Sequence, residues 1–130
     1  MKEIGTLTIR GRIPSKKNQQ QIFRKGKSGV RFITSSESYK EWEKSQIRNL
    51  PVNLVYSNIC KITMYFWFPD NLRSDLTNKS ESIMDMLVKA KVISDDNWKT
   101  IPSICLKAEG VDKENPRVEV KFYNVERINQ

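Results

Sequence analysis

The chain has 130 residues, of which 38% are hydrophobic and 29% charged, and its formal net charge is +8. This length predicts one domain, covering residues 1–130, with a modest hydrophobic core. The sequence contains no histidine and two cysteines, Cys60 and Cys105. We therefore expect neither a structural zinc site nor a nucleophile activated by histidine, so any catalysis would use carboxylates, lysines or a metal ion.

The apolar segments of the chain are short. Its first residues have no apolar stretch of the kind that a secretory signal needs. The longest apolar run, residues 62–68, is far shorter than a membrane span. We therefore expect a soluble, cytoplasmic protein with no membrane partner. In a reducing compartment its two cysteines are expected to be small core residues rather than a disulfide.

The positive charge is concentrated in the first part of the chain. Residues 1–50 contain twelve lysines and arginines and four acidic residues, whereas residues 51–130 contain eleven of each sign. Between Arg10 and Arg31 there are eight basic residues and no acidic one. A solvated basic face is one interpretation, but a surface that binds a polyanion is favoured because no opposite charge neutralises it. The candidate nucleic-acid contacts are Lys16, Lys17, Asn18, Arg24, Lys25, Lys27 and Arg31.

The first half of the chain predicts three strands and one helix. Alternating apolar and polar residues indicate a strand at residues 4–11, which a loop at residues 14–18 ends. Short strands at 21–24 and 30–34 flank the turn KGKSG and predict a hairpin with basic residues at its tip. Ser35 or Ser36 can cap a helix that runs to about residue 50, where Pro51 stops it. Its aromatic and apolar residues are expected in the core rather than stacked on bases.

The second half predicts three further strands and one further helix. Residues 60–68 have apolar side chains on both faces, which is typical of a central strand or of one that contacts another subunit. A helix follows from Asp75, a turn at residues 94–98, and strands at 103–109 and 117–123. The order is β-β-β-α-β-α-β-β. We therefore expect an α+β fold with a mainly antiparallel mixed sheet packed against two helices.

The helix that begins at Asp75 combines an apolar stripe with an acidic face. Its periodicity groups Leu76, Ile83, Met86, Leu87 and Ala90 on one side, and Asn78, Glu81, Ser82, Asp85 and Lys89 on the other. Any amphipathic surface helix shows such a pattern, so periodicity alone favours a structural role. Asp75 also suits a helix N-cap. The residues Asp95, Asp96 and Asn97 suit a turn or a second cap.

Spacing along this helix limits which side chains can share a metal ion. Asp75 and Asn78 are about 4.5 Å apart in rise, and Glu81 and Asp85 about 6 Å, so each pair could converge. The two pairs are too far apart to share one Mg²⁺ with bonds of about 2.1 Å. A metal site therefore needs a carboxylate from elsewhere in the chain. The obvious suppliers are Asp95 and Asp96.

These acidic residues resemble the motif of the RusA-type Holliday junction resolvases. The sequences DLTNK at 75–79 and ISDDN at 93–97, with Asp85 between them, are similar to the family's acidic pattern. Upstream, Pro14, Ser15 and Asn18 resemble its N-terminal loop, and residues 34–39 resemble the segment before its first helix. The resemblance covers roughly residues 14–96, and its acidic motif is the more specific part.

The resemblance implies a RusA-like fold and a Mg²⁺-dependent endonuclease. Such an enzyme resolves four-way DNA junctions by paired symmetric nicks, as a homodimer, in recombination and repair in a bacterial or phage-infected cell. Asp75 and Asp96 match carboxylates that bind the catalytic Mg²⁺, and Asp95 and Asp85 match the acids beside them. The implied metal ligands are therefore Asp75, Asp96, Asp95 and Asp85.

Two positions differ from the family pattern. Thr77 occupies the place of the second aspartate at the helix start, and Glu81 occupies the place of a lysine. Glu81 could restore the missing carboxylate, and Lys79 could supply positive charge that stabilises the transition state. The candidate catalytic residues are Asp75, Asp96, Glu81 and Lys79.

The sequence is also compatible with two functions other than this endonuclease. The chain could be a non-catalytic domain that binds branched DNA or another nucleic acid, with its acids serving as caps and solvated charges. It could also be a different Mg²⁺-dependent enzyme that acts on a nucleotide, which the basic N-terminal segment disfavours.

Overall fold

The computed structural model describes residues 1–14, 20–25, 30–35 and 37–125. Within these residues, six strands and two helices follow one another in the order that the sequence predicts. The elements are β1 (Lys2–Arg10), β2 (Gln20–Lys25), β3 (Val30–Ser35), α1 (Glu37–Asn49), β4 (Ile59–Phe68), α2 (Leu76–Lys89), β5 (Ile104–Val111) and β6 (Arg117–Asn124). The predicted α+β fold is confirmed.

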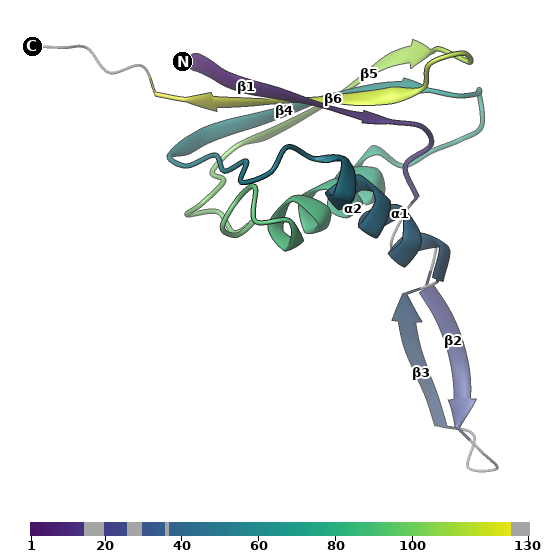
Figure 1. Cartoon of the computed structure of the whole chain (residues 1–130). Helices are drawn as coiled ribbons and strands as arrows, with labels where there is room; N and C mark the ends of the chain where they lie inside the picture. The colour runs from purple at the N-terminus through teal and green to yellow at the C-terminus, as the bar shows by residue number, and fades with distance from the viewer. Residues whose placement is uncertain (15–19, 26–29, 36, 126–130) are drawn as a thin grey trace, which may run out of the picture.

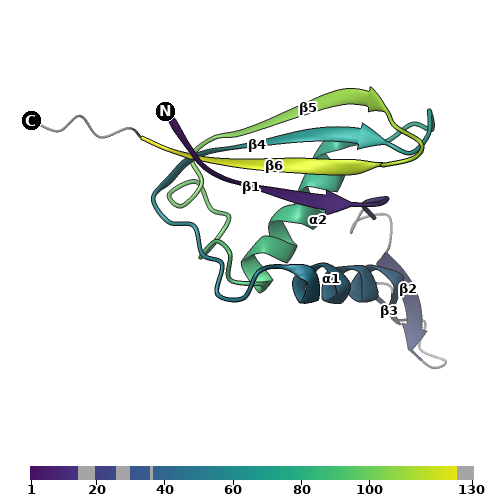
Figure 2. The ribbon, with the colours of Figure 1, turned by 45° about the horizontal axis from the view of Figure 1, so that its top comes forward.

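The main sheet has four strands in the order β1-β6-β4-β5. β6 pairs antiparallel with both β1 and β4, whereas β4 and β5 are parallel. Parallel neighbours need a long crossover, and α2 supplies it. The sheet is therefore mixed and mainly antiparallel, as expected, with β4 and β6 at its centre (Figure 2).

Both helices cover the same face of this sheet (Figures 1 and 2). Alternate side chains of the two central strands point into the core because successive residues of a strand face opposite sides. The fully buried core side chains from β4, β6 and α2 are Ile62, Met64, Phe66, Val118, Val120, Phe122, Ile83, Met86 and Leu87. Cys60 and Cys105 are free and only partly buried, so no disulfide joins them.

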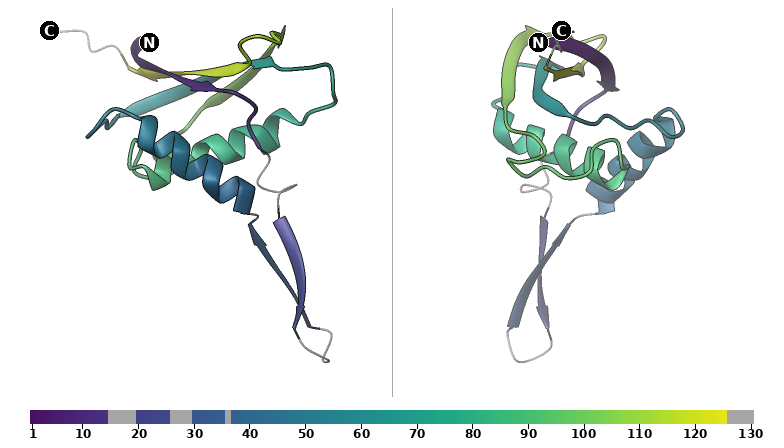
Figure 3. Two further views of the ribbon diagram at one scale, coloured as in Figure 1. Left: turned by 45° about the vertical axis from the view of Figure 1, so that its right-hand side comes forward. Right: turned by 90° about the vertical axis from the view of Figure 1, so that its left-hand side faces the viewer.

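The strands β2 and β3 form a separate two-stranded antiparallel hairpin. The hairpin projects from the helical side of the molecule, away from the four-stranded sheet (Figures 1 and 3). We call it the basic arm, because four of the seven predicted nucleic-acid contacts fall between residues 20 and 31.

Local chemistry explains where α2 begins and ends. Asp75 caps its first turn, and Lys91 follows its C-cap residue Ala90 with a left-handed φ of 64°. The stripe predicted to be apolar faces the sheet. Ser82, predicted on the exposed face, is instead fully buried because the chain at Pro14 covers it. Neither helix in the described part of the chain has the length and hydrophobicity needed to span a membrane.

Candidate functional site

Asp75 lies at the start of α2, where its carboxylate organises the first helical turn. Its Oδ1 accepts a hydrogen bond of 3.0 Å from the backbone N–H of Thr77 and one of 2.6 Å from the Thr77 hydroxyl. Thr77, which stands where the resolvase motif has a second aspartate, therefore donates to Asp75 rather than repelling it. The Asp75 side chain is exposed and held in one orientation.

The first half of α2 binds the segment that leads into the basic arm. The Lys79 ammonium donates to the carbonyl oxygen of Ile13, and the Ser82 hydroxyl donates to the carbonyl of Pro14 at 2.6 Å. Burial and the nearby Arg12 charge lower the pKa of Lys79, while Asp70 acts in the opposite direction. Lys79, predicted to stabilise a transition state, thus holds the base of the arm in this chain.

An ion pair stands beside this attachment. The Arg12 guanidinium binds the Asp70 carboxylate, and the backbone N–H of Leu72 donates to the same carboxylate at 3.0 Å. The hydrogen bond from Arg12 lowers the pKa of Asp70 most, followed by that from Leu72. The Arg12–Asp70 ion pair thus lies beside Lys79, next to the start of α2.

A groove with a volume of ≈ 390 Å³ runs between α1 and α2. We call it the interhelical groove; it is lined by Tyr39, Lys40, Glu43, Asp85, Val88, Lys89 and Asp96. Glu43, only 6% exposed, accepts hydrogen bonds from the Tyr39 hydroxyl at 3.2 Å and from the Lys89 ammonium at 2.8 Å. Glu43 was not predicted as a site residue. The signal for it is an acid four residues after Tyr39 and four before Ile47, within the apolar stripe of α1.

Several carboxylates act on Tyr39 at the edge of this groove. Burial raises the pKa of Tyr39 well above its usual value of 10.0, and the negative charges of Glu43, Asp85 and Glu81 raise it further. Glu81 and Asp85 therefore both lie near enough to Tyr39 to act on its hydroxyl electrostatically.

The Asp95–Asp96 pair lies in a hydrogen-bonded turn after α2. One oxygen of Asp95 accepts from the N–H of Asp96 at 2.7 Å, and the other accepts from the Asn97 amide at 3.0 Å. The Asn97 side-chain oxygen in turn accepts from the N–H groups of Lys99 and Thr100, both at 3.0 Å. The turn role considered for Asp95 and Asn97 is therefore present, and the turn places Asp96 at the interhelical groove.

The two principal candidate acids lie toward opposite ends of α2. The helix has 14 residues, which corresponds to a length of about 21 Å. Asp75 precedes its first turn, whereas Asp96 lines a groove with Asp85 and Lys89 from its last turns. Carboxylate oxygens suit Mg²⁺ chemically. Within residues 1–14, 20–25, 30–35 and 37–125, however, no three acidic or cysteine side chains converge closely enough to hold a metal ion.

The predicted nucleic-acid contacts are only partly described by the structure. Lys16, Lys17, Asn18 and Lys27 lie outside the described residues. Arg24 and Lys25 belong to β2, and Arg31 belongs to β3. The hairpin register sets Arg24 opposite Arg31, so the backbone brings two basic positions side by side.

The chain matches no protein-family model and no curated protein.

Proposed function

We propose that the chain is a Mg²⁺-dependent, structure-specific endodeoxyribonuclease that acts as a homodimer on branched DNA, including four-way junctions. One observation carries this proposal: a single helix, α2, has candidate metal ligands toward both ends and binds the base of the basic arm through its first half. The same helix thus links an acidic centre to a segment suited to a polyanion. This combination is what hydrolysis of a phosphodiester in DNA requires.

The separation of the acids explains why a dimer would be needed. Because Asp75 and Asp96 lie toward opposite ends of α2, a two-fold dimer with antiparallel α2 helices would set Asp75 of each protomer against Asp96 of the partner subunit. Two-fold symmetry makes every such contact occur twice. A dimer of this kind has two equivalent acidic centres, one for each of the paired nicks.

Each residue has a role in this arrangement. Asp75, oriented by Thr77, and Asp96, whose backbone N–H donates to Asp95, would hold the ion, with Asp85 and Asp95 beside them. Mg²⁺, when bound, supplies Lewis-acid polarisation of the phosphate and neutralises developing charge. The exposed carboxylate of Glu81 is available to accept a proton from the attacking water.

The DNA-binding part of the proposal depends on charge. The basic residues between Arg10 and Arg31 would contact phosphates, which gives affinity that falls steeply with salt and depends little on sequence. Lys79 and Ser82 would then fix where the arm directs the DNA relative to α2, because both bind its base directly.

A second candidate is a DNA-binding domain without catalytic activity. The observation that favours it is that Asp75 and Asp95 each have a complete structural role, as a helix cap and in a turn. Thr77 in place of an aspartate points the same way.

Cleavage assays separate the two candidates. The full chain would be offered a labelled four-way junction and a linear duplex of the same sequence, with Mg²⁺ or with EDTA. We expect paired nicks in the junction that need Mg²⁺ and are lost in Asp75→Asn and Asp96→Asn. The matched control Glu114→Gln, an exposed acid in the β5–β6 loop, should cut normally. Tight junction binding with no cleavage in Mg²⁺ or Mn²⁺ would reject the nuclease in favour of the binding domain.

The role of Glu81 is tested in the same assay. If its carboxylate takes part in the chemistry, Glu81→Gln should abolish nicking while junction affinity stays within about twofold, because the exposed side chain contributes little to binding a polyanion. Normal nicking by this variant would remove Glu81 from the site.

A further inference from the structure

The face of the sheet opposite the helices presents aromatic residues on its two central strands. In the described part of the chain no element covers this face (Figures 1 and 2). The side chains that alternate with the core residues of β4 and β6 include Tyr65, Trp67 and Tyr123, all partly exposed. We call this surface the open face. Aromatic rings so placed on a sheet are a known platform for stacked bases.

Basic side chains lie against each of these rings. The ammonium groups of Lys107 and Lys121 are each 5.8 Å from the centroid of Tyr65, one reaching from β5 and the other from β6. Lys61 lies 5.6 Å from the centroid of Tyr123. The lysines therefore alternate with the aromatic rings across three strands, and the face combines π surfaces with positive charge.

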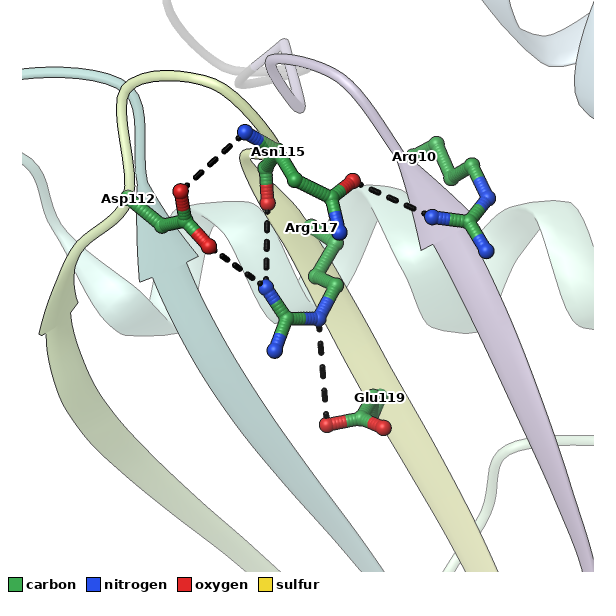
Figure 4. A network of polar contacts seen from close by, with 5 residues as sticks. All are labelled: Arg10, Asp112, Asn115, Arg117 and Glu119. Carbon is green, nitrogen blue, oxygen red and sulfur yellow. Dashed lines mark hydrogen bonds and ion pairs between the residues drawn. The ribbon is translucent and has the colours of Figure 1, made fainter.

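The arginine on this face is held in place, and among the lysines Lys121 lies 3.6 Å from the Glu3 carboxylate. The Arg117 guanidinium lies 4.0 Å from the centroid of Trp67 and donates to Asp112 at 3.0 Å and to the Asn115 carbonyl at 3.1 Å. Figure 4 shows this network, with Glu119 4.0 Å from Arg117. Two acids neutralise Arg117, so it acts as a rigid planar surface over the ring. Because Glu3 likewise pairs with Lys121, positive charge for a phosphate must come from Lys61 and Lys107.

We propose that the open face binds single-stranded DNA, with bases stacked on its rings and phosphates bound by Lys61 and Lys107. Tyr65 and Trp67 are two residues apart on β4, which corresponds to about 6.7 Å. Stacked bases in a duplex strand rise only about 3.4 Å each. The ring spacing therefore fits an extended strand with splayed bases, not a duplex. The choice of DNA over RNA rests on the proposed function.

The test measures binding without cleavage. A labelled oligothymidine of about 12 nucleotides is titrated with the full chain in EDTA, and the variants carry single changes at Tyr65 or Lys107. Tyr65→Ala should weaken binding about 5- to 150-fold, the range for loss of one base–aromatic stack, whereas Tyr65→Phe keeps the ring and the affinity. Lys107→Glu should weaken binding and reduce the salt slope by about 0.7. The same charge change in Lys44→Glu, on the exposed side of α1, should leave both unchanged.

A second measurement follows the fluorescence of Trp67, which lies on the open face. Trp42→Phe combined with Trp98→Phe leaves Trp67 as the only tryptophan, and its emission should be quenched by the oligonucleotide. Unchanged affinity in both Tyr65→Ala and Lys107→Glu, together with unquenched Trp67, would overturn the proposal. So would an equally strong effect of these variants on duplex binding, or tighter binding of oligouridine than of oligothymidine. Failure of the nuclease proposal appears separately, as absence of cleavage in Mg²⁺ while binding in EDTA persists.

Discussion

A mixture of two inactive variants should recover cleavage if the acidic centre forms between protomers. Asp75→Asn and Asp96→Asn are each expected to be inactive alone, because every centre in either homodimer lacks one carboxylate. In a mixed dimer one centre combines the intact Asp75 of one chain with the intact Asp96 of the other. The second centre carries both substitutions. This outcome follows from the length of α2, about 21 Å, which keeps the two acids of one chain apart.

The size of the recovery follows from the symmetry of the dimer. Random exchange of equal amounts gives about half mixed dimers, each with one intact centre, so about a quarter of the wild-type centres are restored. Because the second centre of each mixed dimer is inactive, the product should be single nicks rather than paired ones. A centre built within one chain would instead give no recovery, since every chain in the mixture carries a substitution.

The assay uses a junction with a different fluorophore on each of the two strands that are cut. Differently tagged chains are co-expressed, and mixed dimers are isolated through both tags. A mixed dimer of wild type and Asp75→Asn is the positive control, because either arrangement leaves it one intact centre. Inactive Asp75→Asn/Asp96→Asn dimers beside an active control would refute the shared centre.

Three further predictions concern stability. Ser82→Ala should lower the free energy of unfolding in urea by about 1–3 kcal/mol, because the buried hydroxyl donates to a backbone carbonyl at 2.6 Å; a change no larger than that of Ser80→Ala would contradict this role. Gly5→Ala should cost about 1–3 kcal/mol and lower Tm, because its methyl carbon would lie 2.0 Å from the Tyr56 hydroxyl oxygen; an unchanged Tm would reject the clash. The pKa of Tyr39 is higher in the folded protein than its usual value of 10.0, so folding favours the protonated hydroxyl. The free energy of unfolding therefore keeps its full value below pH 10.0 and decreases as pH rises above it. Tyr39→Phe should remove this alkaline loss, at most about 1.4 kcal/mol per pH unit; identical pH profiles for the two proteins would exclude the effect.

The sequence predicted the local elements well because each has a strong local signal. Alternation marked β1, a nearly continuous apolar run marked β4, turn residues marked the hairpin, and Asp75 marked the start of α2. Ser82 was expected on the exposed polar face of α2, and it is buried there because helical periodicity does not report a segment that packs over that face. The contact that buries it comes from Pro14, 68 residues away in the chain.

The sequence named the candidate acidic residues, but it did not predict how they are arranged in space. Spacing along α2 indicated that a metal site would need a carboxylate from outside the helix, and Asp95 and Asp96 were the expected suppliers. The direction in which the chain leaves α2 could not be read from spacing. Asp96 lies with Asp85 at the interhelical groove, so a metal centre that combines Asp96 with Asp75 would need a second protomer.

The sequence alone therefore determined the elements, their order, the basic segment and the acids that could serve a metal, since these depend on neighbouring residues. Tertiary structure decided which face of the sheet stays open and which aromatic rings meet lysines there. It also decided that α2 binds the base of the basic arm and that Asp75 and Asp96 lie toward opposite ends of that helix. Those relations depend on contacts between residues far apart in the chain, which packing of the whole core sets and no local pattern records.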